Sequence, residues 1–372
     1  MDRTSSILSL NVTGNPTRAA KADRGQALAH RFKTFVKRLA YRTGGLDICH
    51  RLRNRHTLTV VMFHRVLPRS DLRWKGADPE WTMSTDAFSA CLHFFKKHYH
   101  PISLAQLAAA QAGESTLPPR SLLITFDDGW ADTSEFAQPI LDGLGLQALI
   151  FIAGSVIDQA APFWQESVYR TLSASTDGMS RLNSAMARCH IDARLTQREA
   201  RDEQSIRSVI RALETVELAR LNELARVLQT DSNESAAMMT ASQLRKMADC
   251  RHAIGSHGMT HQPLTKVENP TEEVTQAKQA LMSHLNEFPI DSMSFPHGAY
   301  DSKVVASCRA MGYRHLFSSD AFLNKFDNAD KNGRIWGRIH ISERAIADAQ
   351  GRFHPFMLAT SLFLRPRTML AG

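Results

Sequence analysis

The sequence has few cysteines and pairs none of them at close spacing. Its 372 residues include five, at Cys49, Cys91, Cys189, Cys250 and Cys308, and no two form a C-x-x-C arrangement. An odd and scattered set argues against a disulfide framework and against a cysteine-ligated zinc site. A reducing compartment therefore fits this cysteine usage best.

Long apolar runs are missing as well. No stretch approaches the roughly 18–20 apolar residues that a membrane-spanning helix needs, and residues 1–25 lack the continuous apolar core of a secretory signal. We therefore expect a cytoplasmic location, with any membrane contact being peripheral, at the inner face of the membrane.

Nucleotide-binding and serine-hydrolase signatures are also absent. The segment Gly143-Leu144-Gly145 lacks a third glycine and follows a predicted helix, which is not the arrangement of a dinucleotide-binding loop. The sequence contains neither a Walker A motif nor a G-x-S-x-G elbow. These absences exclude the commonest phosphate-binding loops and the α/β-hydrolase nucleophile.

Positive charge is concentrated near the N-terminus. The net charge is +8, and residues 1–58 carry twelve Lys and Arg against three Asp, so the remainder is about neutral. Within residues 28–40, apolar side chains recur at helical spacing with basic residues between them, at Leu28, Phe32, Phe35, Val36 and Leu39. This pattern predicts a basic amphipathic helix.

Three interpretations of this helix remain open. It docks on the domain with a solvated basic face, it contacts an anionic membrane surface, or it binds nucleic acid. No recognisable nucleic-acid motif accompanies the charge, so we expect no nucleic-acid partner. Nothing in the sequence indicates an oligomeric state.

Short apolar segments alternate with helical ones along most of the chain. The strands are expected at 57–63, 121–126, 147–153, 252–256, 293–295, 315–319 and 338–342, and the helices at 86–97, 103–112, 133–144, 272–287 and 302–311. This alternation predicts an α/β fold with a parallel sheet or a β/α barrel. We expect a basic N-terminal extension at 1–56, a barrel at 57–345 and a C-terminal tail at 346–372. A helical insertion at 155–245, either a lid or a partner surface, interrupts the barrel.

Several predicted strands end directly on a titratable residue. These residues are His64, the pair Asp127 and Asp128, and His257. In a β/α barrel the C-terminal strand ends meet at one face, where the active site lies. Residues far apart in the sequence would then share one pocket.

Two short motifs at these strand ends carry metal chemistry. Adjacent carboxylates cannot point the same way, so one of Asp127 and Asp128 can bind a metal while the other faces the substrate. The alternative is a surface turn. His257 and His261 lie four residues apart and can reach one cation from a helical turn, although such a pair alone is more often structural. Two histidines and one carboxylate leave open positions, which is typical of a catalytic metal.

The motifs Thr125-Phe126-Asp127-Asp128-Gly129 and His257-x-x-x-His261 resemble those of the polysaccharide deacetylases, carbohydrate esterase family 4 with its NodB-homology domain. The similarity extends from residues 60–68 to 338–342. It implies a distorted (β/α) barrel of the polysaccharide deacetylase type. It also implies that Asp127 is the general base and that Asp128, His257 and His261 bind a divalent metal, zinc being the expected one.

The resemblance extends to two later motifs. Phe295-Pro296-His297-Gly298-Ala299-Tyr300 is similar to the family's third motif, and Arg338-Ile339-His340 is a loose match to its last, which makes His340 the expected general acid. The alternative for His340 is a strand residue that points outward. Ser294 stands where the family often has an arginine that pairs with the base, so we expect Asp127 to lack that partner.

The implied reaction is metal-dependent removal of N-acetyl groups from an amino-sugar-containing glycan, either a polysaccharide, an oligosaccharide or a lipid-linked glycan. Two alternatives remain: a catalytically inactive carbohydrate-binding barrel, and an O-acetyl esterase on a related glycan. Residues expected to contact the N-acetylated glycan are His64, Trp130, Pro296, His297 and Tyr300. The alternative for His64 is a hydrogen-bonded structural histidine at a strand end.

Overall fold

The computed structural model describes residues 32–159, 161–192, 202–230, 237–286, 288–326, 334–348 and 350–366. Of the helix expected at 28–40, residues 32–42 are helical, and Leu28 lies outside the described residues. In the described part of the chain, no helix combines the length and the apolar character that crossing a membrane requires.

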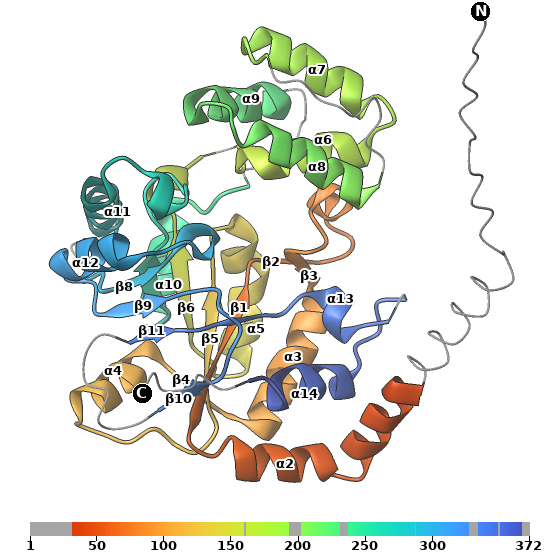
Figure 1. Ribbon diagram of the computed structural model, residues 1–372, viewed down its shortest axis with the longest axis vertical. Helices are drawn as coiled ribbons and strands as arrows, with labels where there is room; N and C mark the ends of the chain where they lie inside the picture. The colour runs from red at the N-terminus through yellow and green to blue at the C-terminus, as the bar shows by residue number, and fades with distance from the viewer. Residues whose placement is uncertain are drawn as a thin grey trace, which may run out of the picture.

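A nearly closed, mostly parallel sheet forms the centre of the molecule (Figure 1). Its strands run in the spatial order β10 (Asn324–Lys325), β1 (Thr57–Phe63), β5 (Ser121–Phe126), β6 (Ala148–Ile152), β7 (Ala253–Ser256), β8 (Ser292–Ser294), β9 (His315–Phe317) and β11 (Ile335–Trp336). Strand β12 (Ile339–His340) follows β11 along the chain and pairs in parallel with β1. The chain thus returns from the β11 side of the row to β1, the sheet is nearly closed, and the predicted distorted barrel is confirmed.

Three further strands lie outside this row, namely β4, β2 and β3. Strand β4 (His100–Ile102) pairs in parallel with β5. Within the row itself, β10 is antiparallel to β1. A separate parallel pair is formed by β2 (Arg65–Leu67) and β3 (Thr82–Ser84). The expected strand at 57–63 matches β1, whereas the expected strand at 338–342 shortens to the two residues of β12.

The alternation of side chains along β1 and β5 continues into the residues that follow each strand. Leu58 and Val60 of β1 share one hydrophobic cluster with Leu123 of β5. Successive side chains on a strand point to opposite faces, so positions two apart share a face. His64 continues the parity of Leu58 and Val60, and Asp127 continues that of Leu123. Polar residues therefore replace the apolar filling where these strands end.

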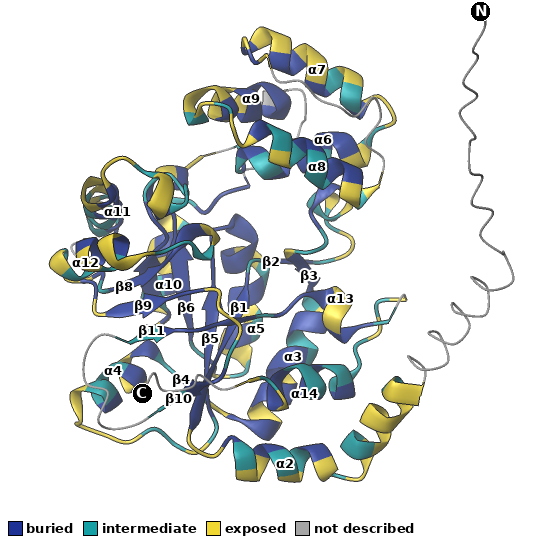
Figure 2. Cartoon of the chain, viewed as in Figure 1, coloured by how far each residue is buried: buried dark blue, intermediate teal, exposed yellow. Residues whose placement is uncertain are grey.

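Helices surround the sheet (Figures 1 and 2). They are α2 (Gly45–Arg53), α3 (Thr85–His98), α4 (Leu104–Ala112), α5 (Gln138–Gly143), α10 (Ala241–Asp249), α11 (Pro270–His284), α12 (Ser302–Ala310), α13 (Glu343–Ile346) and α14 (Pro355–Phe363). Short helical turns are η1 (Leu72–Gly76), η2 (Thr133–Ala137), η3 (Gly154–Val156), η4 (Leu264–Lys266) and η5 (Pro296–Gly298). Leu358 and Leu362 of α14 are buried in the main core, so a packed helix occupies part of the segment expected as a tail.

Four helices form a group of their own at one end of the molecule, at the top of Figure 1. They are α6 (Trp164–Ala174), α7 (Gly178–Arg188), α8 (Glu203–Leu213) and α9 (Leu218–Thr230). Their apolar faces build a separate hydrophobic cluster that includes Val168, Leu182, Val209 and Leu224. These helices lie within the segment expected as an insertion. The domain boundaries themselves stay a prediction.

Candidate active site

A cavity of about 380 Å³ lies between the barrel and the four-helix group. Its lining includes most of the residues expected at the site, namely His64, Asp127, Asp128, Trp130, His257, His261 and His297. Pro296, Tyr300 and His340 are not among the lining residues. The barrel forms one wall of the cavity and the four-helix group forms the other, because Gln165 of α6 and Arg207 of α8 also face the cavity. The strand ends of the barrel therefore share one pocket.

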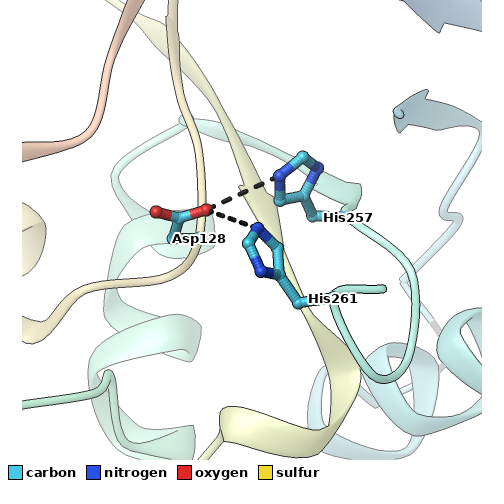
Figure 3. A group of neighbouring side chains, drawn as sticks. All are labelled: Asp128, His257 and His261. Carbon is cyan, nitrogen blue, oxygen red and sulfur yellow. Dashed lines mark ion pairs between the residues drawn. The ribbon is translucent and has the colours of Figure 1, made fainter. Parts of the chain in front are cut away.

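Asp128, His257 and His261 form a compact group within this pocket (Figure 3). The Oδ1 atom of Asp128 lies 3.5 Å from Nε2 of His257 and 3.2 Å from Nε2 of His261. One ligand atom from each residue falls within 4.8 Å of the other two. A carboxylate and two imidazoles suit a divalent ion with an open coordination position.

Neighbouring groups orient these three side chains for a metal. Nδ1 of His257 lies 2.9 Å from the carbonyl oxygen of Ser294, which holds the ring proton on Nδ1 and leaves the Nε2 lone pair toward Asp128. Trp130 donates its indole N–H to Oδ2 of Asp128 at 2.9 Å, so Oδ1 faces the histidines. Burial lowers the pKa of His257 to about 4, which keeps its ring neutral as a ligand must be.

The backbone at the group adopts conformations that non-glycine residues rarely take. Asp128 has φ of 81° and His261 has φ of 60°, both in the left-handed region. Gly129, which directly follows Asp128, has φ of 86°. A Cβ atom at Gly129 would lie 2.9 Å from a side-chain carbon of Ile152. Gly129 thus permits the close turn that places Asp128 over the strand ends.

Asp127 points to a different partner, the guanidinium of Arg338. Nη1 and Nη2 of Arg338 donate to the two carboxylate oxygens of Asp127 at 2.6 and 2.7 Å. Both side chains are almost completely buried. Burial alone would raise the pKa of Asp127, but the charge of Arg338 and the nearby histidines hold it below its ordinary value. Asp127 is therefore ionised beside the candidate metal ligands.

Arg338 corrects the expectation that Asp127 lacks an arginine partner. Ser294 indeed has no charge, but its hydroxyl accepts a hydrogen bond from Nη2 of Arg338 at 2.6 Å. The remaining donors of the guanidinium reach the carbonyl of Ser318 at 3.0 Å and the hydroxyl of Thr125 at 3.3 Å. The arginine thus enters from the segment between β11 and β12 rather than from β8. A charged residue in the otherwise apolar run around Ile335–Ile341 is the sequence signal that could have revealed it.

Comparisons with known proteins agree with this geometry. A family model described as polysaccharide deacetylase matches residues 222–316, a stretch that holds His257 and His261 but not the Asp127–Asp128 pair. Over residues 222–316 the chain is therefore similar to polysaccharide deacetylases, the family that its motifs resemble.

Two solved structures share the fold of this chain. The deacetylase PplD of Streptococcus pyogenes, solved in complex with acetate, has a TM-score of 0.52 and 15% identity over 83% of this chain and 99% of its own. IcaB from Ammonifex degensii has a TM-score of 0.51 and 14% identity over 83% of this chain and 97% of its own. A search of curated proteins found no match. At such identities the likeness concerns the fold.

Two histidines, His64 and His340, lie near Asp127, and they differ in their access to the cavity. The buried Nδ1 of His64 has no hydrogen-bond partner in the described part of the chain, and His64 lines the pocket. The ring of His340 meets that of His64 edge-on at 5.3 Å, and its Nδ1 lies 3.7 Å from Glu80. Trp81 contacts both rings, at 4.5 and 4.7 Å. His64 and Trp81 thus line the cavity, whereas His340 contacts both of their rings and is not part of the lining.

The other expected substrate contacts separate into two groups. His297 lines the pocket, with its ring centroid 4.9 Å from that of His261. The hydroxyl of Tyr300 instead donates to Asp320 at 2.9 Å, and the Tyr300 ring stacks on Phe295. Pro296 is buried and packs near Gly258. The third motif therefore presents Phe295, His297 and Gly298 to the cavity, while Pro296 and Tyr300 are not part of its lining.

A buried ion network joins the barrel to the four-helix group. Nε of Arg65 donates to Asp132 at 2.9 Å, and Nη1 of Arg65 donates to Glu166 of α6. The guanidinium of Arg65 also lies 4.3 Å from the ring centroid of Trp130. Arg65 thereby connects the indole that orients Asp128 to the first helix of the group. Sequence reasoning did not single out Arg65, which follows His64 directly.

Proposed function

We propose that this chain removes N-acetyl groups from an amino-sugar-containing glycan and releases acetate. The observation that carries the proposal is the position of an ionised carboxylate, Asp127, held by Arg338 beside the group of Asp128, His257 and His261. We further propose that this group holds a divalent ion, zinc being the expected one. The chemistry that such an ion supplies when bound is Lewis-acid activation of water and of a carbonyl group.

In this proposal Asp127 acts as the general base. Its low pKa keeps it ionised at neutral pH, and the bidentate contact with Arg338 prevents rotation of the carboxylate. Each carboxylate oxygen has two lone pairs, so accepting from Arg338 leaves capacity for a water molecule. Asp127 takes a proton from that water as the water attacks the acetamide carbonyl.

A proton donor for the departing amine must reach the cavity. The family resemblance points to His340, but His64 lines the pocket and His340 does not. Burial lowers the pKa of His64, and the negative charges of Asp128 and Asp127 oppose this shift by favouring the protonated ring. We therefore propose that His64 donates the proton and that His340 positions the ring of His64.

The alternative of an inactive binding barrel rested on the absent arginine and on the altered motif around His340. Arg338 supplies a guanidinium to Asp127, so the first reason no longer holds. The O-acetyl esterase alternative shares the same groups and differs only in the bond that is cleaved. A substrate panel separates the two reactions.

The test is acetate release from matched N-acetylated and O-acetylated sugars and oligosaccharides. We expect release from the N-acetylated members, loss of release after chelation, and recovery on adding zinc. Asp127→Asn should reduce turnover by about 10²-fold or more, since general-base catalysis contributes on that scale, while bound metal measured by elemental analysis stays stoichiometric. Asp249→Asn, at the exposed end of α10, is the matched control. Full turnover by Asp127→Asn would refute the assigned base, and release from esters alone would refute the amidase.

A further inference from the structure

Exposed apolar side chains are concentrated at one place outside the pocket. Ten large hydrophobic residues are exposed in the described part of the chain, and six of them lie on helix 32–42 and α2: Phe32, Phe35, Val36, Leu39, Ile48 and Leu52. The helix that precedes α2 is drawn largely in the colour of exposed residues in Figure 2. Contiguous exposed apolar surface of this kind marks a contact site.

The four apolar residues of helix 32–42 share one side of it. At 3.6 residues per turn, Phe32, Phe35, Val36 and Leu39 fall within about 100° of arc. Phe32 is 67% exposed and Phe35 is 60% exposed. The helix therefore presents a continuous apolar stripe that covers no part of the described barrel.

The opposite side of the same helix faces the protein. Thr34 and Tyr41 lie about half a turn from the apolar arc and are half-buried. The Tyr41 ring lies 6.2 Å from the ring of His98 on α3, and Tyr41 packs against the main core. The apolar stripe thus points away from the body of the molecule.

Basic residues flank the stripe on both sides. Lys33 and Lys37 border one edge, and Arg38 and Arg42 border the other. Residues 32–55 together carry seven Lys and Arg against the single acid Asp47. An apolar stripe between two basic edges is the arrangement of a helix that lies in the interface of an anionic membrane.

We propose that helix 32–42, together with α2, docks on an anionic lipid surface. A second copy of the same face is a poorer partner, because symmetric pairing would bring the basic edges of the two copies together. Eleven residues of helix extend about 16 Å, too short to cross a bilayer, so the helix lies along the surface. The proposal does not depend on the reaction at the pocket.

The test measures co-sedimentation of the full chain with large vesicles. We expect binding to phosphatidylcholine vesicles containing phosphatidylglycerol, and much weaker binding to phosphatidylcholine alone. Lys33→Gln with Lys37→Gln should weaken partitioning by about tenfold or more. The matched control is Lys266→Gln with Lys303→Gln, which removes two exposed lysines elsewhere and should leave partitioning unchanged except for a small net-charge effect.

A second pair of variants tests the apolar stripe. Phe32→Ser with Phe35→Ser should weaken partitioning by about tenfold or more at unchanged charge, whereas Leu72→Ser with Phe288→Ser, which alters exposed apolar residues elsewhere, should not. Circular dichroism verifies folding, and sedimentation velocity without lipid reports self-association. Three outcomes would overturn the proposal. A control pair could weaken partitioning as much as its test pair, or binding could be independent of lipid charge. The third is a dimer that dissociates only in the variant Phe32→Ser with Phe35→Ser. Because no acetate is measured, these outcomes are independent of the proposed reaction.

Discussion

The two walls of the pocket differ in how their polar groups are used. On the barrel wall, Asp127, Arg338 and His257 are almost completely buried, and each makes hydrogen bonds to protein groups. On the wall formed by the four-helix group, Gln165 is half-buried and Glu214 is exposed. The barrel wall is therefore preorganised before any ligand arrives, as catalytic groups need to be.

The wall formed by the four-helix group, here called the helical wall, is attached to the barrel by charged pairs. Its helices have a hydrophobic cluster of their own. Arg65 contacts Glu166, Arg207 contacts Asp78 at 2.8 Å, and Arg344 contacts Glu203. A barrel that holds the reacting groups and a helical wall with its own core can vary separately. We infer that chemistry resides on the first wall and glycan recognition on the second.

The largest effect is expected at Arg338. Arg338→Met leaves the Asp127 carboxylate buried without its cation, and breaking a buried ion pair in this way costs about 3–5 kcal/mol of unfolding free energy. Turnover should fall as well, because the base loses its orientation. Urea unfolding and acetate release measure the two effects. Arg314→Met is the matched control, since its pair with Asp291 lies at the surface with the arginine side chain 72% exposed.

A second substitution separates orientation from general damage. Ser294→Arg combined with Arg338→Met moves the guanidinium to the position that the family motif uses. We expect this double variant to regain part of the turnover that Arg338→Met loses. A double variant that regains stability but stays as inactive as Arg338→Met would show that Asp127 needs the guanidinium at the position of Arg338, whereas full turnover by Arg338→Met under native conditions would show that Arg338 only stabilises the fold.

A smaller effect is expected at His64 and His340, the two histidines near Asp127. His64→Gln should lower kcat by about 10²-fold, the scale of a lost general acid. His340→Gln should lower it less, by about tenfold, because His340 acts through the ring of His64. Stopped assays on both variants, with bound metal measured in parallel, give the comparison. The reverse order would assign the proton donor to His340.

The barrel wall was largely predictable from local sequence. Strand 57–63 and strand 121–126 appear as continuous apolar runs, and each is followed by a titratable residue, His64 or Asp127. Parallel pairing of β1 with β5 then brings those ends together. Residues whose role is set by the strand on which they lie can be identified in this way.

Arg338 and Glu166 could not be identified by the same reasoning. The contact of Arg338 with Asp127 spans 211 residues and depends on β12 returning beside β1. The contact of Glu166 with Arg65 depends on how α6 packs over the barrel. Neither residue stands in a motif of fixed spacing that identifies its partner. Long-range pairing of charges is decided by the tertiary fold, so the helical wall remained without assigned roles.

The smallest effect tests the helical wall directly, at Gln165. Its Oε1 atom is buried and has no hydrogen-bond partner within the described residues, yet Gln165 lines the pocket. An unpaired buried acceptor is unfavourable, so a substrate hydroxyl or amide is its expected donor. Gln165→Leu should raise KM by about tenfold or less with kcat nearly unchanged, because only uniform binding is lost.

The matched control for Gln165 is Gln204→Leu, on the exposed side of α8. It should change neither KM nor kcat. If Gln165→Leu instead lowers kcat as strongly as the histidine variants, the helical wall takes part in the reaction, and the division between the two walls is wrong. If neither parameter moves while thermal stability rises, the Oε1 atom meets no substrate group. Recognition would then belong to the barrel wall, where His297 and Trp81 line the same cavity.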